Sequence, residues 1–66
     1  MSIMVNGEPA QPAATVAELV GRLGVGPSPR GIAVAVDGVV VPRSQWPQYP
    51  LHDGARVEVV SAAQGG

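Results

Sequence analysis

The chain has 66 residues, of which 45% are hydrophobic and 14% are charged, and its formal net charge is −1. This length holds one small domain, and the apolar content excludes a disordered chain, which combines low hydrophobicity with high net charge. The four basic residues are all Arg and form no basic stripe, which argues against nucleic-acid binding, and no apolar run approaches the roughly 18 residues that a membrane-spanning helix needs.

Cysteine is absent from the chain, and histidine occurs once, as His52. These counts exclude disulfides, thiolate nucleophiles, zinc–thiolate sites and multi-histidine metal sites. Residues 1–6 contain neither a basic segment nor a long apolar stretch, so no signal peptide is expected. We therefore expect a cytoplasmic protein without a bound metal.

Two dipeptides, Asn6-Gly7 and Asp37-Gly38, predict tight hairpin turns. Both positions of a type I′ turn need positive φ, which Asn, Asp and Gly tolerate best. The strands that flank these turns are expected at residues 2–5, 8–14, 32–36 and 39–41. The second of these strands contains two prolines, which cannot donate to a ladder, so it is expected at an edge of the sheet.

A helix is predicted from Thr15, because Thr15 and Glu18 match a capping box. The Thr15 hydroxyl would accept from the Glu18 amide, and the Glu18 side chain would accept from the Thr15 amide. Four apolar residues then follow at helical spacing and are expected to face the core: Val16, Leu19, Val20 and Leu23. Gly24 is expected to end the helix, and residues 25–31 are expected to form a loop.

Residues 43–50 predict an irregular turn with one helical turn at residues 43–46. This segment contains Trp46, which has two interpretations: it caps the edge of the core, or it contacts a partner, since Trp is enriched at binding hot spots. His52 stands beside Asp53 in a further turn, and a solvated histidine is expected there.

The last strand is expected at residues 55–61, and a helix on a small sheet covers one face of it. The open face would then carry Met4, Val60 and Ala35. These residues form a candidate docking patch, although a domain of this size also exposes apolar atoms without any binding role.

The sequence finishes with Gln64-Gly65-Gly66, which we interpret as the working part of a tail at residues 62–66 that follows a domain at residues 1–61. Glycines make this end slim, and five extended residues reach roughly 17 Å, far enough to enter a buried pocket. The carboxyl group of a terminal glycine is ionised at neutral pH and can be joined to AMP as a mixed anhydride. The alternative is an ordinary frayed terminus.

The chain offers no catalytic signature of its own, because its serines lack a nucleophile-elbow pattern and its glycines do not form a phosphate-binding loop. We therefore expect a protein that is acted on by an enzyme and is not itself an enzyme.

Over nearly its whole length the sequence resembles the ThiS family, the sulfur-carrier proteins of thiamine biosynthesis. The segments that carry the resemblance are Val5-Asn6-Gly7, Ala33-Val34-Ala35-Val36-Asp37-Gly38, Val41-Pro42-Arg43-Ser44-Gln45-Trp46, Leu51-His52-Asp53-Gly54 and Gln64-Gly65-Gly66. The resemblance implies an α+β fold, the β-grasp of ubiquitin-like proteins. This is a mixed sheet of four to five strands with one main helix on one face, and its first and last strands are parallel neighbours.

The resemblance also implies a function. The Gly66 carboxylate would be adenylated with ATP by an E1-like partner, ThiF, and converted to a thiocarboxylate with sulfur from a donor enzyme. The sulfur would then pass to the thiazole synthase, ThiG, and the carrier itself would bind no cofactor.

Three other functions remain open. The small subunit of molybdopterin synthase has the same fold and terminal chemistry. A ubiquitin-like modifier would be joined to a lysine of another protein. A plain interaction module would not use its terminus at all.

Overall fold

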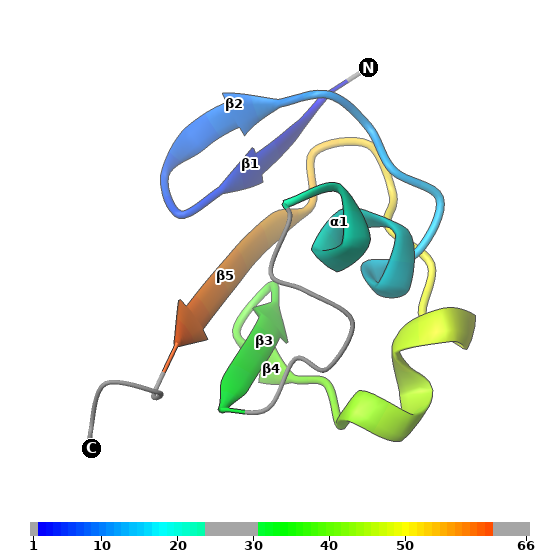
Figure 1. The fold of residues 1–66 in the computed structure, drawn as a ribbon. Helices are drawn as coiled ribbons and strands as arrows, with labels where there is room; N and C mark the ends of the chain where they lie inside the picture. The colour runs from blue at the N-terminus through cyan, green and yellow to red at the C-terminus, as the bar shows by residue number, and fades with distance from the viewer. Residues whose placement is uncertain (1, 24–30, 62–66) are drawn as a thin grey trace.

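The structure is a computed structural model that describes residues 2–23 and 31–61. In this part of the chain, five strands form one sheet and a short α-helix packs on one of its faces (Figure 1). The strands are β1 (Ile3–Val5), β2 (Glu8–Ala10), β3 (Ile32–Val36), β4 (Val39–Val40) and β5 (Arg56–Ser61). The helices are α1 (Val16–Arg22) and a 3-10 helix, η1 (Arg43–Gln48).

The sheet is mixed, with the strand order β2-β1-β5-β3-β4. β1 and β5 are parallel neighbours, whereas β3 pairs antiparallel with both β5 and β4. A parallel pair requires a long crossover connection, and α1 lies in the chain between the two strands. The predicted parallel pairing of the first and last strands is confirmed.

Both predicted hairpin turns are present. Asn6 and Gly7 have φ of 52° and 84°, and Asp37 and Gly38 have φ of 52° and 85°, as a type I′ turn requires. These left-handed angles are the reason for the choice of residues at both turns.

The strand after the first turn is shorter than predicted. β2 ends at Ala10, whereas the sequence predicted a strand over residues 8–14. β1 begins at Ile3, which pairs with Ala10, so the ladder stops there. Beyond it, the Arg22 guanidinium donates to the carbonyls of Gln11 (2.7 Å) and Pro12 (2.6 Å). The backbone acceptors of this segment therefore bind α1 instead of continuing the ladder.

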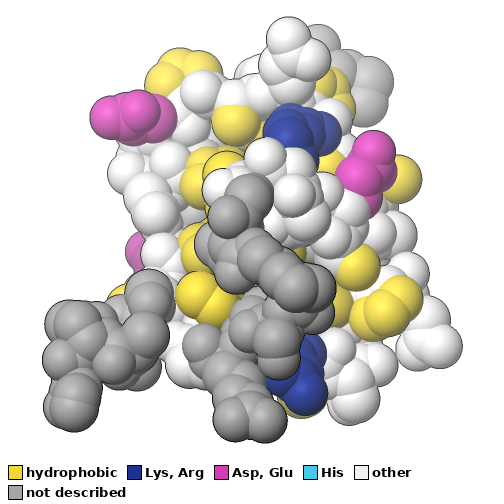
Figure 2. All heavy atoms as spheres, viewed as in Figure 1, with side chains coloured by type: hydrophobic (Ala, Val, Ile, Leu, Met, Phe, Trp, Pro, Cys, Tyr) yellow, Lys and Arg dark blue, Asp and Glu magenta, His cyan; other side chains and the backbone are white. Residues whose placement is uncertain are grey.

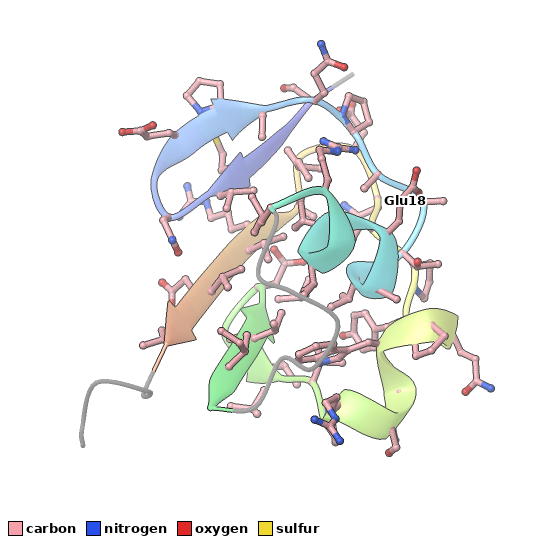
Figure 3. All side chains as sticks on the ribbon, in the orientation of Figure 1. Glu18 is labelled. Atoms are coloured by element: carbon pink, nitrogen blue, oxygen red, sulfur yellow. The ribbon has the colours of Figure 1, made fainter. Side chains whose placement is uncertain are left out.

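The helix begins as predicted, with one change. The Thr15 hydroxyl accepts from the Glu18 amide at 3.2 Å. The Glu18 carboxylate, labelled in Figure 3, accepts from the amide of Ala14 at 2.7 Å and not from that of Thr15. The reciprocal bond of the cap is therefore made one residue earlier than predicted. Beside the cap, Thr15 forms an isolated bridge with Pro50, in which the Val16 amide donates to the Tyr49 carbonyl and the Leu51 amide to the Ala14 carbonyl. The expected helix end at Gly24 and most of the expected loop lie outside the described residues.

The core lies between α1 and the sheet. Its largest fully buried side chains are Ile3, Val16, Leu19, Val34 and Val57. Leu23, which the sequence also predicted to be in the core, is 43% exposed. It follows the last helical residue, so its side chain lies beyond the part of the helix that packs on the sheet.

Trp46 belongs to the core as well. Its side chain is 4% exposed, and its indole Nε1 donates to the carbonyl of Val41 at 2.9 Å. The helical segment that carries Trp46 is η1, which extends to Gln48 and is longer than the predicted turn over residues 43–46. The burial corrects the prediction of Trp46 as a docking residue and supports its other interpretation, a cap at the edge of the core.

The contrast between Leu19 and Leu23 gives a matched test. Leu19→Ala should lower the free energy of unfolding by about 2–5 kcal/mol, because it removes a fully buried side chain and leaves a cavity. Leu23→Ala should cost less than about 1 kcal/mol, since its side chain is already partly in water. Urea unfolding followed by tryptophan fluorescence measures both. Equal losses would contradict the packing described here.

Candidate functional site

The candidate site is the exposed face of the sheet together with the end of β5, from which the chain continues toward the predicted tail. Strand β5 ends at Ser61, and Figure 1 shows it running past the helix toward the C-terminus. The predicted tail residues Gln64, Gly65 and Gly66 lie outside the described residues. Their proposed role therefore rests on the sequence and on the position of β5.

Alternation along β5 divides its residues between the two faces of the sheet. Val57 is buried beneath α1, whereas Val60, 58% exposed, lies on the open face. The register places Val60 opposite Ala33 of β3, and Ala35 lies opposite both Glu58 and Val40. Val40 is 70% exposed. Ala33, Ala35, Val40 and Val60 thus form the apolar patch of the open face. It extends from the C-terminal end of β5, at Val60 and Ala33, to Ala35 and Val40, which are level with Glu58.

Met4 lies on the same open face but is not part of this patch. It is half-buried and pairs with Arg56, at the beginning of β5. Four residues along a strand separate Arg56 from Val60, a distance of roughly 13 Å. The predicted pair of docking residues is therefore placed on one face but at opposite ends of it, with the charged Glu58 between them.

Sequence reasoning missed Val40. A two-residue hairpin turn fixes the register of its strands, so the Asp37-Gly38 turn already places residue 40 opposite residue 35. The position of Val40 on the open face could therefore have been predicted from the sequence by counting the register outward from this turn.

A hollow on the same face is lined by Met4, Gly7, Arg56, Val57 and Glu58. This end of the face is charged, in contrast to the apolar patch. On the side shown in Figure 2, the basic side chains lie in separate groups and do not form a stripe. Within the described ranges, no three His, Cys, Asp or Glu side chains come together as metal ligands. The described helices are all too short to cross a membrane.

His52 forms an ion pair that the sequence did not predict. Its Nε2 lies 2.7 Å from Oδ2 of Asp37, and its Nδ1 lies 2.8 Å from the carbonyl of Asp53. Both neighbours are acceptors, so the doubly protonated imidazolium satisfies both contacts. The hydrogen bond to the Asp37 carboxylate is the largest cause that raises the pKa of His52 above its ordinary value, and the bond to the Asp53 carbonyl is the second largest. The pair connects the β3–β4 turn to the segment before β5, at the end of the sheet away from the tail.

The Asp37 carboxylate has a second partner at the start of β5. Its Oδ1 accepts from the backbone amide of Arg56 at 3.0 Å. This bond is the largest cause of the lowered pKa of Asp37, and the bond to His52 is the second largest.

The fold can now be assigned to a class. A mixed five-stranded sheet with a parallel central pair and one helix across one face defines a β-grasp, or ubiquitin-like, protein. A crystal structure of a thiamine biosynthesis protein (ThiS) from Geobacter metallireducens superimposes with a TM-score of 0.78 and 28% identity, over 92% of this chain and 93% of that one. The predicted fold class is confirmed.

The family follows from the sequence comparison. The family model described as the ThiS family matches residues 3–66. The chain belongs to the ThiS family. It is also 37% identical, over 68 aligned positions, to a thiazole synthase of Paramagnetospirillum magneticum. The alignment includes all of this chain but spans only 20% of the length of that relative.

The His52–Asp37 pair predicts a pH dependence of stability. A raised His pKa gives a contribution that is complete below the ordinary value of 6.5 and is lost as the pH rises through the raised pKa. A lowered Asp pKa gives a contribution that is present above the ordinary value of 3.8 and is lost as the pH falls through the lowered pKa. The pair should therefore stabilise the fold most between these two ordinary values.

Asp37→Asn tests this dependence, because Asn tolerates the φ of 52° at this turn. The difference in unfolding free energy between wild type and variant should be larger at about pH 5 than at about pH 9. An NMR titration of the His52 ring should give a pKa above 6.5 in the wild type and a lower one in the variant. Identical titration curves would show that the pair does not form in solution.

Proposed function

We propose that this chain is a sulfur carrier of thiamine biosynthesis whose working group is the carboxylate of Gly66. The observation that carries the proposal is the family match, which extends from residue 3 through Gly65 and Gly66. The similarity to a ThiS thiamine biosynthesis protein over nearly the whole of both chains supports the same role.

The proposed reaction begins at the terminal carboxylate, which is ionised at neutral pH. In the active site of an E1-like enzyme it attacks the α-phosphorus of ATP, pyrophosphate leaves, and a mixed anhydride with AMP forms. Sulfur at the sulfide level (hydrosulfide supplied by a donor enzyme) then attacks the acyl carbon and forms the C–S bond. The C–O bond to AMP breaks, AMP leaves with its electron pair, and the thioacid loses its proton to solvent. The product is a thiocarboxylate. The carrier is a co-substrate, binds no cofactor of its own, and works in the cytoplasm, where ATP is available.

The second proposed partner is a thiazole synthase, which would receive the sulfur. A relative of this chain named thiazole synthase contains a region 37% identical to it, which supports a shared reaction pathway. The apolar patch is the proposed docking surface, because Val60 is exposed on the open face near the end of β5 and Val40 is exposed on the same face. Met4 contributes to the same face at its charged end.

Intact-mass measurement tests the chemistry. Incubation with ATP, an E1-like enzyme of the ThiF type and a sulfur donor should raise the mass by the difference between one sulfur and one oxygen atom. A variant lacking Gly65 and Gly66 should show no gain, because it lacks the terminal group that the enzyme recognises.

Expression of the wild-type chain should restore growth of a thiamine auxotroph. Rescue of a molybdenum-cofactor mutant instead, or protein adducts through lysine, would contradict the proposal.

Two valines of equal exposure test the docking surface. Val60 and Val39 are each 58% exposed, but Val39 lies opposite the buried Val36, on the other side of the sheet from the apolar patch. Val60→Glu should weaken binding to the thiazole synthase at least about tenfold, because it places a charge in an interface that excludes water. Val39→Glu should leave the affinity nearly unchanged. Calorimetric titration measures both, and equal losses would place the interface elsewhere.

A further inference from the structure

Asn6 makes two hydrogen bonds that its turn does not require. Its side-chain Oδ1 accepts from the backbone amide of Val59 at 2.9 Å, and its Nδ2 donates to the carbonyl of Val59 at 3.2 Å. One orientation of the amide satisfies both contacts, with the oxygen facing the N–H and the nitrogen facing the C=O. The backbone amide of Asn6 also donates to the carbonyl of Val57 at 2.9 Å.

These bonds fill a gap in the sheet. On one side, β3 pairs with β5 from Val57 to Ser61. On the other side, β1 pairs only with Arg56 and Val57, because the chain then enters the hairpin turn. Beyond Val57, the Asn6 side chain takes the place of a strand. Its primary amide presents an acceptor and a donor to Val59, as a backbone peptide would.

The position of this contact matters for the tail. Val59 lies two residues before the end of β5 and seven residues before Gly66. The Asn6 contact is therefore the last described hydrogen-bonded contact on the β1 side of β5 before the chain leaves the sheet. Without it, no described hydrogen bond on the β1 side would hold Val59, and β3 alone would hold the end of β5.

We infer that Asn6 is a positioning residue that fixes the point at which the C-terminal segment leaves the sheet. The inference rests on the proposed function. Loss of the contact would release residues at the end of β5, and each released residue must be ordered again when the tail enters a partner. The entropy lost in this ordering weakens the binding of the carrier to its partner. The chemistry at Gly66 takes place in the partner's active site and is unaffected.

Two variants change the bonds of the Asn6 side chain to Val59 without changing the hairpin turn. Asn6→Gly keeps the turn, because glycine accepts the φ of 52° without strain, but removes both bonds to Val59. Asn6→Asp keeps an acceptor for the Val59 amide and places a carboxylate oxygen against the Val59 carbonyl. Thr15→Ala is the control, because it removes the helix cap and lowers stability without touching β5.

The first measurement is amide hydrogen exchange of the whole chain by NMR. In Asn6→Gly, amide exchange at Val59 and Val60 should be faster than in wild type. The increase at these two residues should be larger than the increase at Val57. In Thr15→Ala the three amides should change together, because only global opening is affected. Unchanged relative protection of Val59 in Asn6→Gly would overturn the inference.

The second measurement is the steady-state rate of adenylation by the E1-like enzyme, with the carrier as the varied substrate. For both Asn6 variants KM should rise about five- to tenfold with kcat unchanged, whereas Thr15→Ala should leave both near wild type. A loss of kcat alone, or an equal rise of KM in Thr15→Ala, would overturn the positioning role. If the wild-type chain itself is not adenylated, the proposed function fails, and the exchange data still decide whether Asn6 holds β5.

Discussion

The pairing of β5 with a neighbour on each side is the constraint on which the rest of the structure depends. β1 pairs with it in parallel and β3 pairs with it antiparallel. The parallel pair requires a crossover, and the crossover contains α1, which covers one face of the sheet. The last strand of the domain is therefore also its central one. Val57 is paired with both neighbours, whereas beyond it β5 is paired with β3 and bound by the Asn6 side chain.

Because side chains alternate along β5, its residues point in turn into the core and to the open face of the sheet. Val57 is directed into the core, and Val60 is directed to the open face. The prediction from sequence placed Met4 and Val60 on that face correctly, because alternation is a local property. It could not show that they lie at opposite ends of the face, or that Val40 completes the apolar patch, because those relations depend on the register between strands.

Short strands leave backbone groups unpaired at their ends, and in this chain side chains satisfy several of them. Asn6 binds Val59, Arg22 binds carbonyls beyond the end of β2, and Asp37 binds the amide at the start of β5. These contacts lie at exposed positions, where the side chains replace water as partners of the backbone groups. In a domain this small, polar side chains therefore extend the sheet where the backbone turns away, and this explains why residues selected for a turn also have a second contact.

By itself, the sequence determined the features that depend on neighbouring residues: the two type I′ turns at Asn6 and Asp37, the hydroxyl cap of the helix, and the strands on either side of each turn. The resemblance to a known family supplied the fold and pointed to Gly66. Only the tertiary structure decided that Leu23 is exposed and that His52 pairs with a carboxylate fifteen positions away. The physical reason is that backbone angles and caps are set within a few residues, whereas burial and ion pairing depend on which distant segments the sheet brings together.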